Sequence, residues 1–372
     1  MHIIAIAYKN NVINMLNKLP FTNPDRLETR AILKKLASAH RYLAELKGIA
    51  ATIPNETILI STLSLQEAKD SSEIENIITT HDELFKADLF SESINNPATK
   101  EVQDYAIALR TAFMTVRKSR LIRLQDILNV QQIIEQNKAG LRKLPGTELK
   151  NSITGEVVYT PPQNAIKVES LMNNLVKYIN DDSLCNLDEL IKMSIIHHQF
   201  ESIHPFYDGN GRTGRILNIL YLVSKNLLDL PILYLSRYFI SDKAAYYAQL
   251  QNVRDTDDWE KWIIYILDGI TTTAKETIIL ITEMKILMQK YKHSIRDKLP
   301  KIYRQELLNN LFSHPYTKIE FVMKDLDITR VTATKYLEQL VENGFLQKKK
   351  VGRANYYINV PLCQLLTKEI EA

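Results

Sequence analysis

A stretch of twelve residues near the middle of the chain, HPFYDGNGRTGR from His204 to Arg215, gathers side chains suited to phosphate chemistry. His204 can act as a general base near neutral pH. Asp208 offers a hard oxygen ligand of the kind that Mg²⁺ shares with phosphates. The guanidinium groups of Arg212 and Arg215 match phosphate oxygens in geometry and charge. Together these groups predict a site that binds nucleotide phosphates and acts on them.

Glycine residues are concentrated in the same stretch. The chain has only 10 glycines in 372 residues, well below the usual frequency of about 7%, and three of them are Gly209, Gly211 and Gly214. Pro205 is expected to end the preceding helix, and a new helix is expected to begin near Gly211. Amides at a helix N-terminus form an anion cradle. One histidine or one glycine pair is usually structural, but the whole combination within so short a stretch argues for a site.

The composition is that of an ordinary globular protein, with 45% hydrophobic and 24% charged residues. The net charge of +4 does not by itself imply a polyanionic partner. Cys185 and Cys363 are too few for a disulfide framework or a four-thiolate metal site. The apolar stretch Met1–Tyr8 is too short for a signal segment or a membrane span, and no other run is long enough. We therefore expect a cytoplasmic protein with no membrane partner.

Amphipathic helices are expected over most of the chain, and the scarcity of glycine argues against a doubly wound sheet. The expected helices cover residues 24–48, 99–138, 165–180, 187–203, 212–227, 242–254 and 257–297. A capping box at Ser64 to Glu67 predicts a further helix that continues through Asn76. Residues 140–162 carry three glycines and three prolines around short β-branched runs, which predicts a hairpin and a loop.

The last part of the chain has a different pattern of short elements. The expected helices are Tyr303–Phe312, Ile319–Asp325 and Arg330–Asn343, followed by a hairpin of Phe345–Lys350 and Asn355–Val360. Gly344 is a good residue to end the third helix. Three helices followed by a β-hairpin, in this order, predict a winged helix-turn-helix domain.

The stretch from His204 to Arg215 resembles the signature HxFx(D/E)GNGRxxR of the Fic family at every specified position. The resemblance extends to HHQFESI at 197–203, to LYLSRYFISDKAAYYAQL at 233–250, and to residues 18–80, with LPFTNPD and EAKDSSEIEN. About 250 residues are covered.

This resemblance implies an all-α fold, with the helical core of Fic proteins, a short β-hairpin flap and the C-terminal winged helix. The expected regions are an N-terminal helical region at 1–98, a catalytic core at 99–298 and the winged helix domain at 299–372.

The resemblance also implies a reaction. His204 would deprotonate a Tyr, Ser or Thr hydroxyl on a target protein or on the chain itself, and that oxygen would attack the α-phosphate of ATP and receive AMP. Asp208 would hold a Mg²⁺ ion that bridges the α- and β-phosphates. Arg212 would contact the β-phosphate side and Arg215 the γ-phosphate. Glycine rather than lysine at Gly211 favours AMP transfer over the phosphate transfer of the family's toxin branch.

Further residues take expected roles from the same resemblance. Phe206 would anchor the loop in the core. The residues expected to contact ATP are Gly209, Asn210, Gly211, Arg212, Thr213, Gly214 and Arg215, with Ser241, Tyr246 and Tyr247 on the adenine side. The hairpin at 140–160 would align a target segment by strand pairing, with Leu141 and Arg142 as its expected contact residues. Leu141 stands where an aromatic residue is expected, which bears on target preference.

A second motif predicts regulation. Ser71, Glu75 and Asn76 match the family's inhibitory pattern (S/T)xxxE(G/N), within an expected helix at 64–76. Ser71 and Glu75 are four residues apart, so they share one face of a helix. By resemblance, Glu75 would pair with Arg215 and deny it to the γ-phosphate of ATP.

Other functions fit parts of the sequence. His197 and His198 with His204 could suggest zinc, but neighbours on a helix point about 100° apart, and no second cluster accompanies them. No Walker motif is present. The same core could transfer UMP or phosphocholine instead of AMP. A homodimer is one possible assembly of the chain.

The C-terminal part could instead make the chain a DNA-binding regulator with the Fic core as its sensor. Arg330, Thr332 and Lys335 would then face the groove, with Lys348–Lys350 and Arg353 on phosphates. From residue 301 onward, however, 11 Lys and Arg stand against 8 Asp and Glu. This small excess favours protein docking over DNA.

Overall fold

The computed structural model of the chain describes residues 16–89, 96–150, 154–351 and 354–368, and these are predominantly helical. The helices are η1 (Pro24–Leu27), α2 (Arg30–Ala50), α3 (Glu56–Ile74), α4 (His81–Leu89), α5 (Pro97–Ser119), α6 (Leu124–Glu135), α7 (Ala165–Asn180), η3 (Asp182–Leu184), α8 (Glu189–Ile203), α9 (Asn210–Ser224), α10 (Leu235–Ser241), α11 (Lys243–Thr256), α12 (Trp259–Lys298), α13 (Gln305–Ser313), α14 (Ile319–Leu326), α15 (Arg330–Glu342) and α16 (Val360–Thr367). The strands are β1 (Leu149–Lys150), β2 (Val157–Tyr159), β3 (Tyr316–Thr317), β4 (Gln347–Val351) and β5 (Ala354–Ile358).

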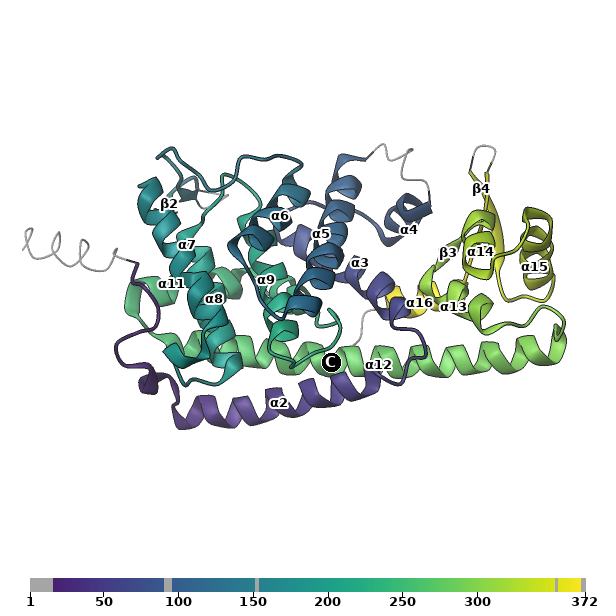
Figure 1. Ribbon diagram of the computed structural model, residues 1–372, viewed down its shortest axis with the longest axis horizontal. Coiled ribbons are helices and arrows are strands. Elements are labelled where there is room, and N and C mark those ends of the chain that lie inside the picture. Colours follow the sequence, from purple (N-terminus) through teal and green to yellow (C-terminus); the bar gives the residue numbers. More distant parts are fainter. Residues whose placement is uncertain (1–15, 90–95, 151–153, 352–353, 369–372) are drawn as a thin grey trace, which may run out of the picture.

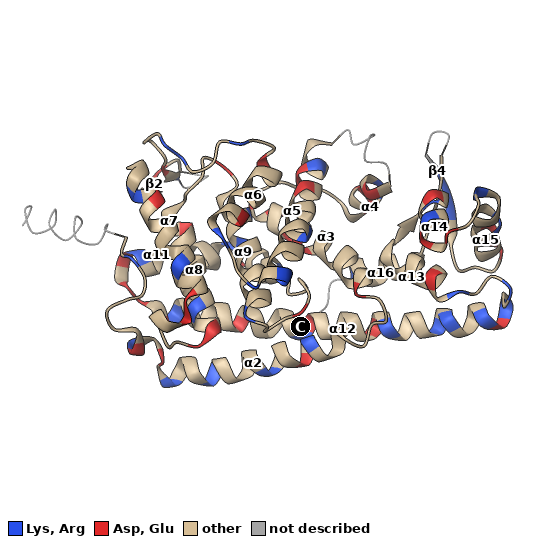
Figure 2. Ribbon diagram, viewed as in Figure 1, with Lys and Arg blue, Asp and Glu red and all other residues tan. Residues whose placement is uncertain are grey.

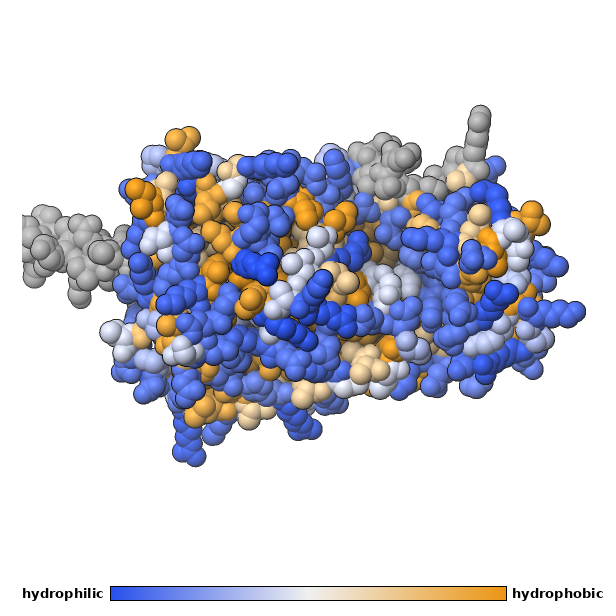
Figure 3. Space-filling view, viewed as in Figure 1, coloured by the Kyte–Doolittle hydropathy of each residue, from blue (hydrophilic) through white to orange (hydrophobic). Residues whose placement is uncertain are grey.

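The long helix α12 spans 40 residues and organises the molecule. Figure 1 shows α2 lying along one half of α12, the helices around α8 and α9 above that half, and α13 to α15 above the other half. Hydrophobic side chains on the face seen in Figure 3 are scattered among hydrophilic ones. No helix in the described part of the chain is long and apolar enough to cross a bilayer.

Helices α8 and α3 both lie deep in the core beside the site. Every residue of α8 from Leu190 to Ile203 is buried, as expected for a helix that is packed on all sides. Helix α3 buries Ile58, Leu59 and Leu63 completely. Both helices therefore have fixed positions relative to the core.

Four expected helices differ from the observed ones. The range 24–48 divides into η1 and α2, because the Thr29 side chain caps a new helix by accepting a hydrogen bond from the N–H of Ile32 at 3.3 Å. The range 99–138 splits into α5 and α6 because Arg120 adopts a left-handed conformation, with φ of 57°, and ends α5. The range 242–254 begins after a separate short helix, α10. The helix expected at 64–76 begins earlier, since the Asn55 side chain accepts a hydrogen bond from the N–H of Thr57 at 3.0 Å. Ser64 is thus inside α3, and its hydroxyl donates to the carbonyl of Ile60 at 2.6 Å.

The expected hairpin at 140–160 contains one short pair of strands. β1 and β2 pair antiparallel, with Leu149 opposite Tyr159 and Lys150 opposite Val157. Residues 140–148 precede the strands and follow an irregular path.

The C-terminal part contains the expected elements in the expected order. Helices α13, α14 and α15 are followed by the hairpin of β4 and β5, and the sheet order is β3-β5-β4. Gly344 ends α15 with φ of 76°. The Tyr291 hydroxyl on α12 joins this part to the long helix, 2.9 Å from Oδ1 of Asn359. Arg353, like Met1–Tyr8, lies outside the described residues.

Candidate active site

The loop between α8 and α9 carries the residues on which the predicted chemistry depends. His204 ends α8 in a left-handed conformation, with φ of 49° and ψ of 61°. Gly209, with φ of 76°, precedes α9, which begins at Asn210, one residue before the expected start. The Asn210 side chain accepts from the N–H of Phe206 at 2.8 Å and donates to its carbonyl at 2.9 Å. Phe206 is fully buried, so the loop is closed on itself and anchored in the core.

His204 lies in an environment that keeps its ring neutral. Burial, followed by the positive charges of Arg254 and Arg142, lowers the pKa of His204 to about 4, against the opposing influence of the Glu201 carbonyl and the Glu75 carboxylate. A neutral imidazole can accept a proton. The side chain is therefore in the form that a general base requires at neutral pH.

Asp208 and the first amides of α9 form the expected phosphate-binding end of the loop. Asp208 is exposed, and its Oδ1 accepts from the N–H of Gly209 at 2.7 Å. No group of three or more His, Cys, Asp or Glu side chains gathers around one point in the described residues. The donor set fits a Mg²⁺ ion that takes most of its other ligands from phosphate oxygens and water.

Arg215 is held by the predicted inhibitory residues. Its Nη2 lies 2.9 Å from Oε1 of Glu75, and it also donates to the hydroxyl and carbonyl oxygens of Ser71, at 2.8 and 2.9 Å. Burial raises the pKa of the Glu75 carboxyl, but the charge and hydrogen bond of Arg215 outweigh it and hold that pKa below its usual value. The Arg215 side chain is 2% exposed and that of Glu75 is 35% exposed. Asn76 follows with φ of 64°.

Gly211 is in direct contact with this pair. A Cβ atom at that position would collide with Oε1 of Glu75 and lie 2.8 Å from Nη1 of Arg215. A side chain at this position would therefore require the ends of Glu75 and Arg215 to shift from the pairing observed. Gly214, the third glycine, lets α9 approach Phe200 and Glu201 of α8.

Arg212 is held by a second pair of carboxylates that the sequence analysis did not identify. Its Nη2 lies 2.7 Å from Oε1 of Glu135 at the end of α6, and its Nη1 lies 3.1 Å from Glu101 on α5. Oε1 of Glu135 also lies 2.5 Å from where a Cβ on Gly209 would stand. Burial, partly offset by Arg212, raises the pKa of Glu135. A carboxyl group therefore lies beside the phosphate-binding loop.

The remaining expected ATP contacts are distributed over different environments. Thr213 is buried, and its hydroxyl has no hydrogen-bond partner among the described residues. Tyr246 is buried with its hydroxyl 2.9 Å from Nε2 of His197. Tyr247 is 44% exposed, with its ring 5.1 Å from that of Tyr246. Ser241 ends α10 rather than beginning a helix, and it lines a separate cavity of about 660 Å³ between α3, α10, α12 and α16.

Arg142 lies behind the base rather than on the exposed hairpin. It precedes β1, it is 2% exposed, and its side chain donates to backbone carbonyls around His204. Leu141 is half-buried against the core. The structure thus places neither residue within the paired strands.

Sequence reasoning missed four residues around the motif. Glu101 and Glu135 pair with Arg212, whereas Tyr159 and Arg254 bind the last turn of α8, just before His204. Each comes from an element distant in the chain and belongs to no motif. Only the fold brings them to α8 and α9.

Three protein-family models match three successive segments of the chain. Residues 33–114 match the N-terminal domain of the Fic/DOC family, and residues 121–222 match the Fic/DOC family itself. Residues 287–362 match the C-terminal domain of the family described as protein adenylyltransferase SoFic-like. The chain thus carries the domains of Fic/DOC family proteins, followed by a SoFic-like C-terminal domain.

Curated relatives are similar over part of their length. A protein adenylyltransferase of Caenorhabditis elegans is 27% identical over 165 residues, which cover 43% of this chain and 30% of that protein. A probable protein adenylyltransferase of Aquifex aeolicus (strain VF5) is 26% identical over 185 residues, or 49% of this chain and 55% of that protein. The match thus covers about a third to a half of these relatives.

Solved structures support the fold. A Fic family protein from Desulfovibrio desulfuricans G20 superposes with a TM-score of 0.57 at 19% identity, and the match covers 92% of this chain and 98% of that one. A fragment of Fic-1 from C. elegans gives a TM-score of 0.51 at 20% identity, covering 68% of this chain and 73% of that one.

Proposed function

We propose that the chain is a protein adenylyltransferase that moves AMP from ATP to a hydroxyl group of a target protein or of the chain itself. The observation that carries this proposal is the arrangement at one loop: a neutral His204 ends α8, and six residues later α9 begins with its amides and two arginines. A base beside a phosphate-binding helix terminus is what such a transfer requires.

In this reaction the hydroxyl proton passes to His204 as the oxygen attacks the α-phosphorus. The new O–P bond forms while the bond from the α-phosphorus to the bridging oxygen breaks, and pyrophosphate leaves with that electron pair. Asp208 would hold Mg²⁺, which when bound neutralises charge on the phosphates. The first amides of α9 and Arg212 would bind the leaving phosphates.

Glu75 is proposed to inhibit the enzyme. The γ-phosphate of ATP and the Glu75 carboxylate both require Arg215, and the carboxylate also repels the triphosphate. Ser71 keeps the arginine in place through two hydrogen bonds, so removal of Glu75 leaves Arg215 positioned for ATP.

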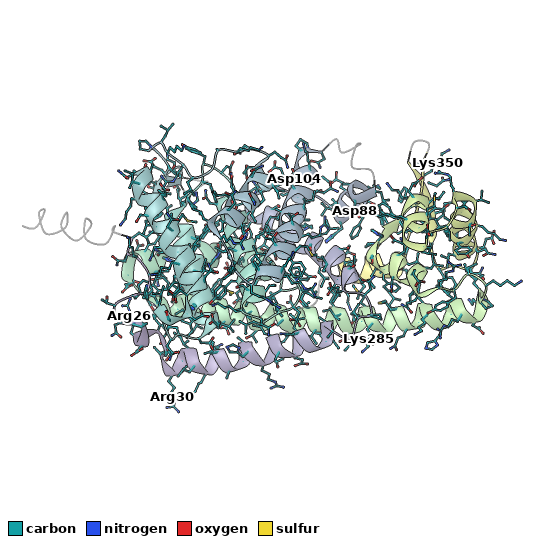
Figure 4. The ribbon with its side chains drawn as sticks, in the orientation of Figure 1. Arg26, Arg30, Asp88, Asp104, Lys285 and Lys350 are labelled. Atoms are coloured by element: carbon teal, nitrogen blue, oxygen red, sulfur yellow. The ribbon has the colours of Figure 1, made fainter. Side chains whose placement is uncertain are left out.

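The C-terminal domain is proposed to dock proteins or position targets. Two basic residues expected to contact DNA are already paired with acids of the same domain: Arg330 with Glu320 at 2.8 Å and Lys348 with Glu338 at 2.6 Å. Figure 2 shows Lys and Arg interspersed with Asp and Glu over the molecule, and Figure 4 shows Lys350 on β4, near the outer end of the hairpin. These pairs reduce the free positive charge that DNA binding needs.

Incubation with ATP labelled at either the α- or the γ-phosphate tests the main proposal. The Glu75→Gly variant should retain label on protein only from α-labelled ATP, and adding His204→Ala should remove that label. Label from the γ position alone would indicate kinase chemistry and refute AMP transfer. UTP or CDP-choline outperforming ATP as donor would assign another transferred group.

A further inference from the structure

The last turn of α8 leaves carbonyl groups without partners in the helix, as every helix does at its C-terminus. In this protein those carbonyls lie next to the proposed base. The carbonyls from Glu201 to Pro205 all accept hydrogen bonds from groups outside α8. These donors come from elements that are distant from α8 in the chain, so the fold itself pairs every carbonyl of this segment.

Arg142 provides three of these contacts. Its Nε donates to the carbonyl of His204 at 2.8 Å, its Nη2 to that of Ile203 at 3.2 Å, and its backbone N–H to that of Pro205 at 2.9 Å. A further bond from Nη2 reaches the carbonyl of Pro162, beyond the hairpin. The planar guanidinium can hold several acceptors in fixed directions, which an ammonium group cannot do.

Tyr159 and Arg254 provide the remaining contacts. The Tyr159 hydroxyl, on β2, donates to the carbonyl of Ser202 at 2.9 Å. Nη2 of Arg254, on α11, donates to the carbonyl of Glu201 at 3.3 Å, and its Nε donates to the Ser202 hydroxyl at 3.1 Å. The Arg254 guanidinium also lies 4.1 Å from the centre of the Tyr159 ring, a cation–π distance.

These contacts fix a backbone conformation that is otherwise uncommon. His204 has positive φ, which costs free energy for a residue with a Cβ and persists only where the surroundings impose it. The direction of the imidazole depends on that backbone. Cations beside carbonyls at a helix C-terminus are also electrostatically favourable.

We propose that Arg142, Tyr159 and Arg254, which we call the carbonyl clamp, are positioning residues for His204, and that through Tyr159 they join the hairpin to the base. The proposal rests on the proposed function of His204. It gives Arg142 a role on the catalytic base in place of direct contact with a target segment.

The clamp also acts on the charge of the base. The charged groups that act on the His204 ring are Arg254, Arg142 and Glu75, together with the carbonyl of Glu201. The two arginines both lower the pKa of His204. Loss of either one should therefore raise that pKa as well as loosen the backbone.

Kinetics in the Glu75→Gly background test the proposal. Arg142→Gln should lower kcat about 100-fold, the effect of a displacement of about 1 Å at a reacting group, while KM for ATP changes less than about threefold because the cradle is intact. Arg142→Lys should recover only part of the lost kcat, since lysine restores the positive charge but not the planar set of donors of the guanidinium. Tyr159→Phe, which removes one hydrogen bond, should lower kcat several-fold.

Arg120→Gln is the matched control. Arg120 also donates to a helix-terminal carbonyl, that of Val223 at the far end of α9, at 2.6 Å. This variant should keep kcat within about twofold of its parent. If it loses as much activity as Arg142→Gln, the effect is one of general stability and the proposal fails.

A measurement without turnover completes the test. The His204 resonance, assigned by its absence in His204→Ala, should titrate at a higher pH in Arg142→Gln and Arg254→Gln than in the parent. If the His204 titration and kcat are both unchanged in these variants, the carbonyl-clamp proposal is refuted. If the Glu75→Gly parent transfers no AMP, the proposed function fails. The His204 titration still tests whether the carbonyl clamp acts on His204. If Arg142→Gln does not fold, Arg142→Lys and Tyr159→Phe carry the kinetic measurement, and Arg254→Gln carries the titration.

Discussion

The Glu75→Gly substitution isolates the contact between Glu75, the proposed inhibitory residue, and Arg215. Hydrogen bonds to charged groups contribute about 1.5–3 kcal/mol, which corresponds to a factor of roughly 10 to 150. Because the Glu75 side chain is 35% exposed, screening by water favours the lower part of this range. We therefore expect the initial rate of automodification to rise about 10- to 40-fold at saturating ATP and Mg²⁺.

The assay follows incorporation of label from α-labelled ATP into the protein. Glu73→Gly is the matched control, because Glu73 lies in the last turn of the same helix, is 36% exposed and pairs with Lys69 instead of Arg215. It should leave the rate unchanged. Equal rates for Glu75→Gly and wild type would refute the reasoning, as would a gain that survives the addition of Arg215→Ala.

Four further predictions use the same preparations. His204→Ala should abolish transfer in the Glu75→Gly background and leave ATP affinity within about threefold; undiminished transfer would exclude His204 as the base. Because the pKa of His204 is lowered to about 4, the base is neutral above that pH, and kcat should show no fall due to His204 between pH 8 and 5.5. Burial raises the pKa of Glu201 to about 7, so a rate that halves near pH 6.5 both in Glu75→Gly and in the double variant with Glu201→Gln would contradict this. Glu135→Gln should lower KM for ATP about three- to tenfold, since it removes a carboxyl group that competes for an arginine beside the phosphates; a higher KM would show that Glu135 orients that arginine instead. Gel shifts with random and own-promoter duplexes at two salt concentrations should show no specific binding, whereas tight binding to one sequence that is lost in Arg330→Ala would favour the DNA-binding regulator.

The parts of the site that lie on one loop could be predicted from the sequence. The loop from His204 to Arg215 is continuous, so its residue types and spacing already define a base, a carboxylate and a helix N-terminus. The pairing of Glu75 with Arg215 joins residues 140 positions apart. It was expected only through resemblance to a known motif, because periodicity cannot bring distant segments together.

Other contacts had no signal in the sequence. Glu135 and Arg254 are ordinary charged residues near the ends of amphipathic helices, where a solvated position is the default expectation. The break at Arg120 was missed because a left-handed arginine ends α5 where glycine would have been the usual mark. Asn55 was overlooked as a helix cap in favour of the pattern at Ser64.

The deep burial of α3 restricts how the proposed inhibition by Glu75 would be relieved. Withdrawing the helix would expose Ile58, Leu59 and Leu63, at about 1.5–3 kcal/mol for each side chain. Rotating the Glu75 side chain away from Arg215 breaks one ion pair at the very end of the helix. The second route costs less free energy, so α3 can keep its position while the Glu75 side chain, at the tip directly after the helix, moves. A compound or partner that activates the enzyme therefore needs to reach no further than this tip.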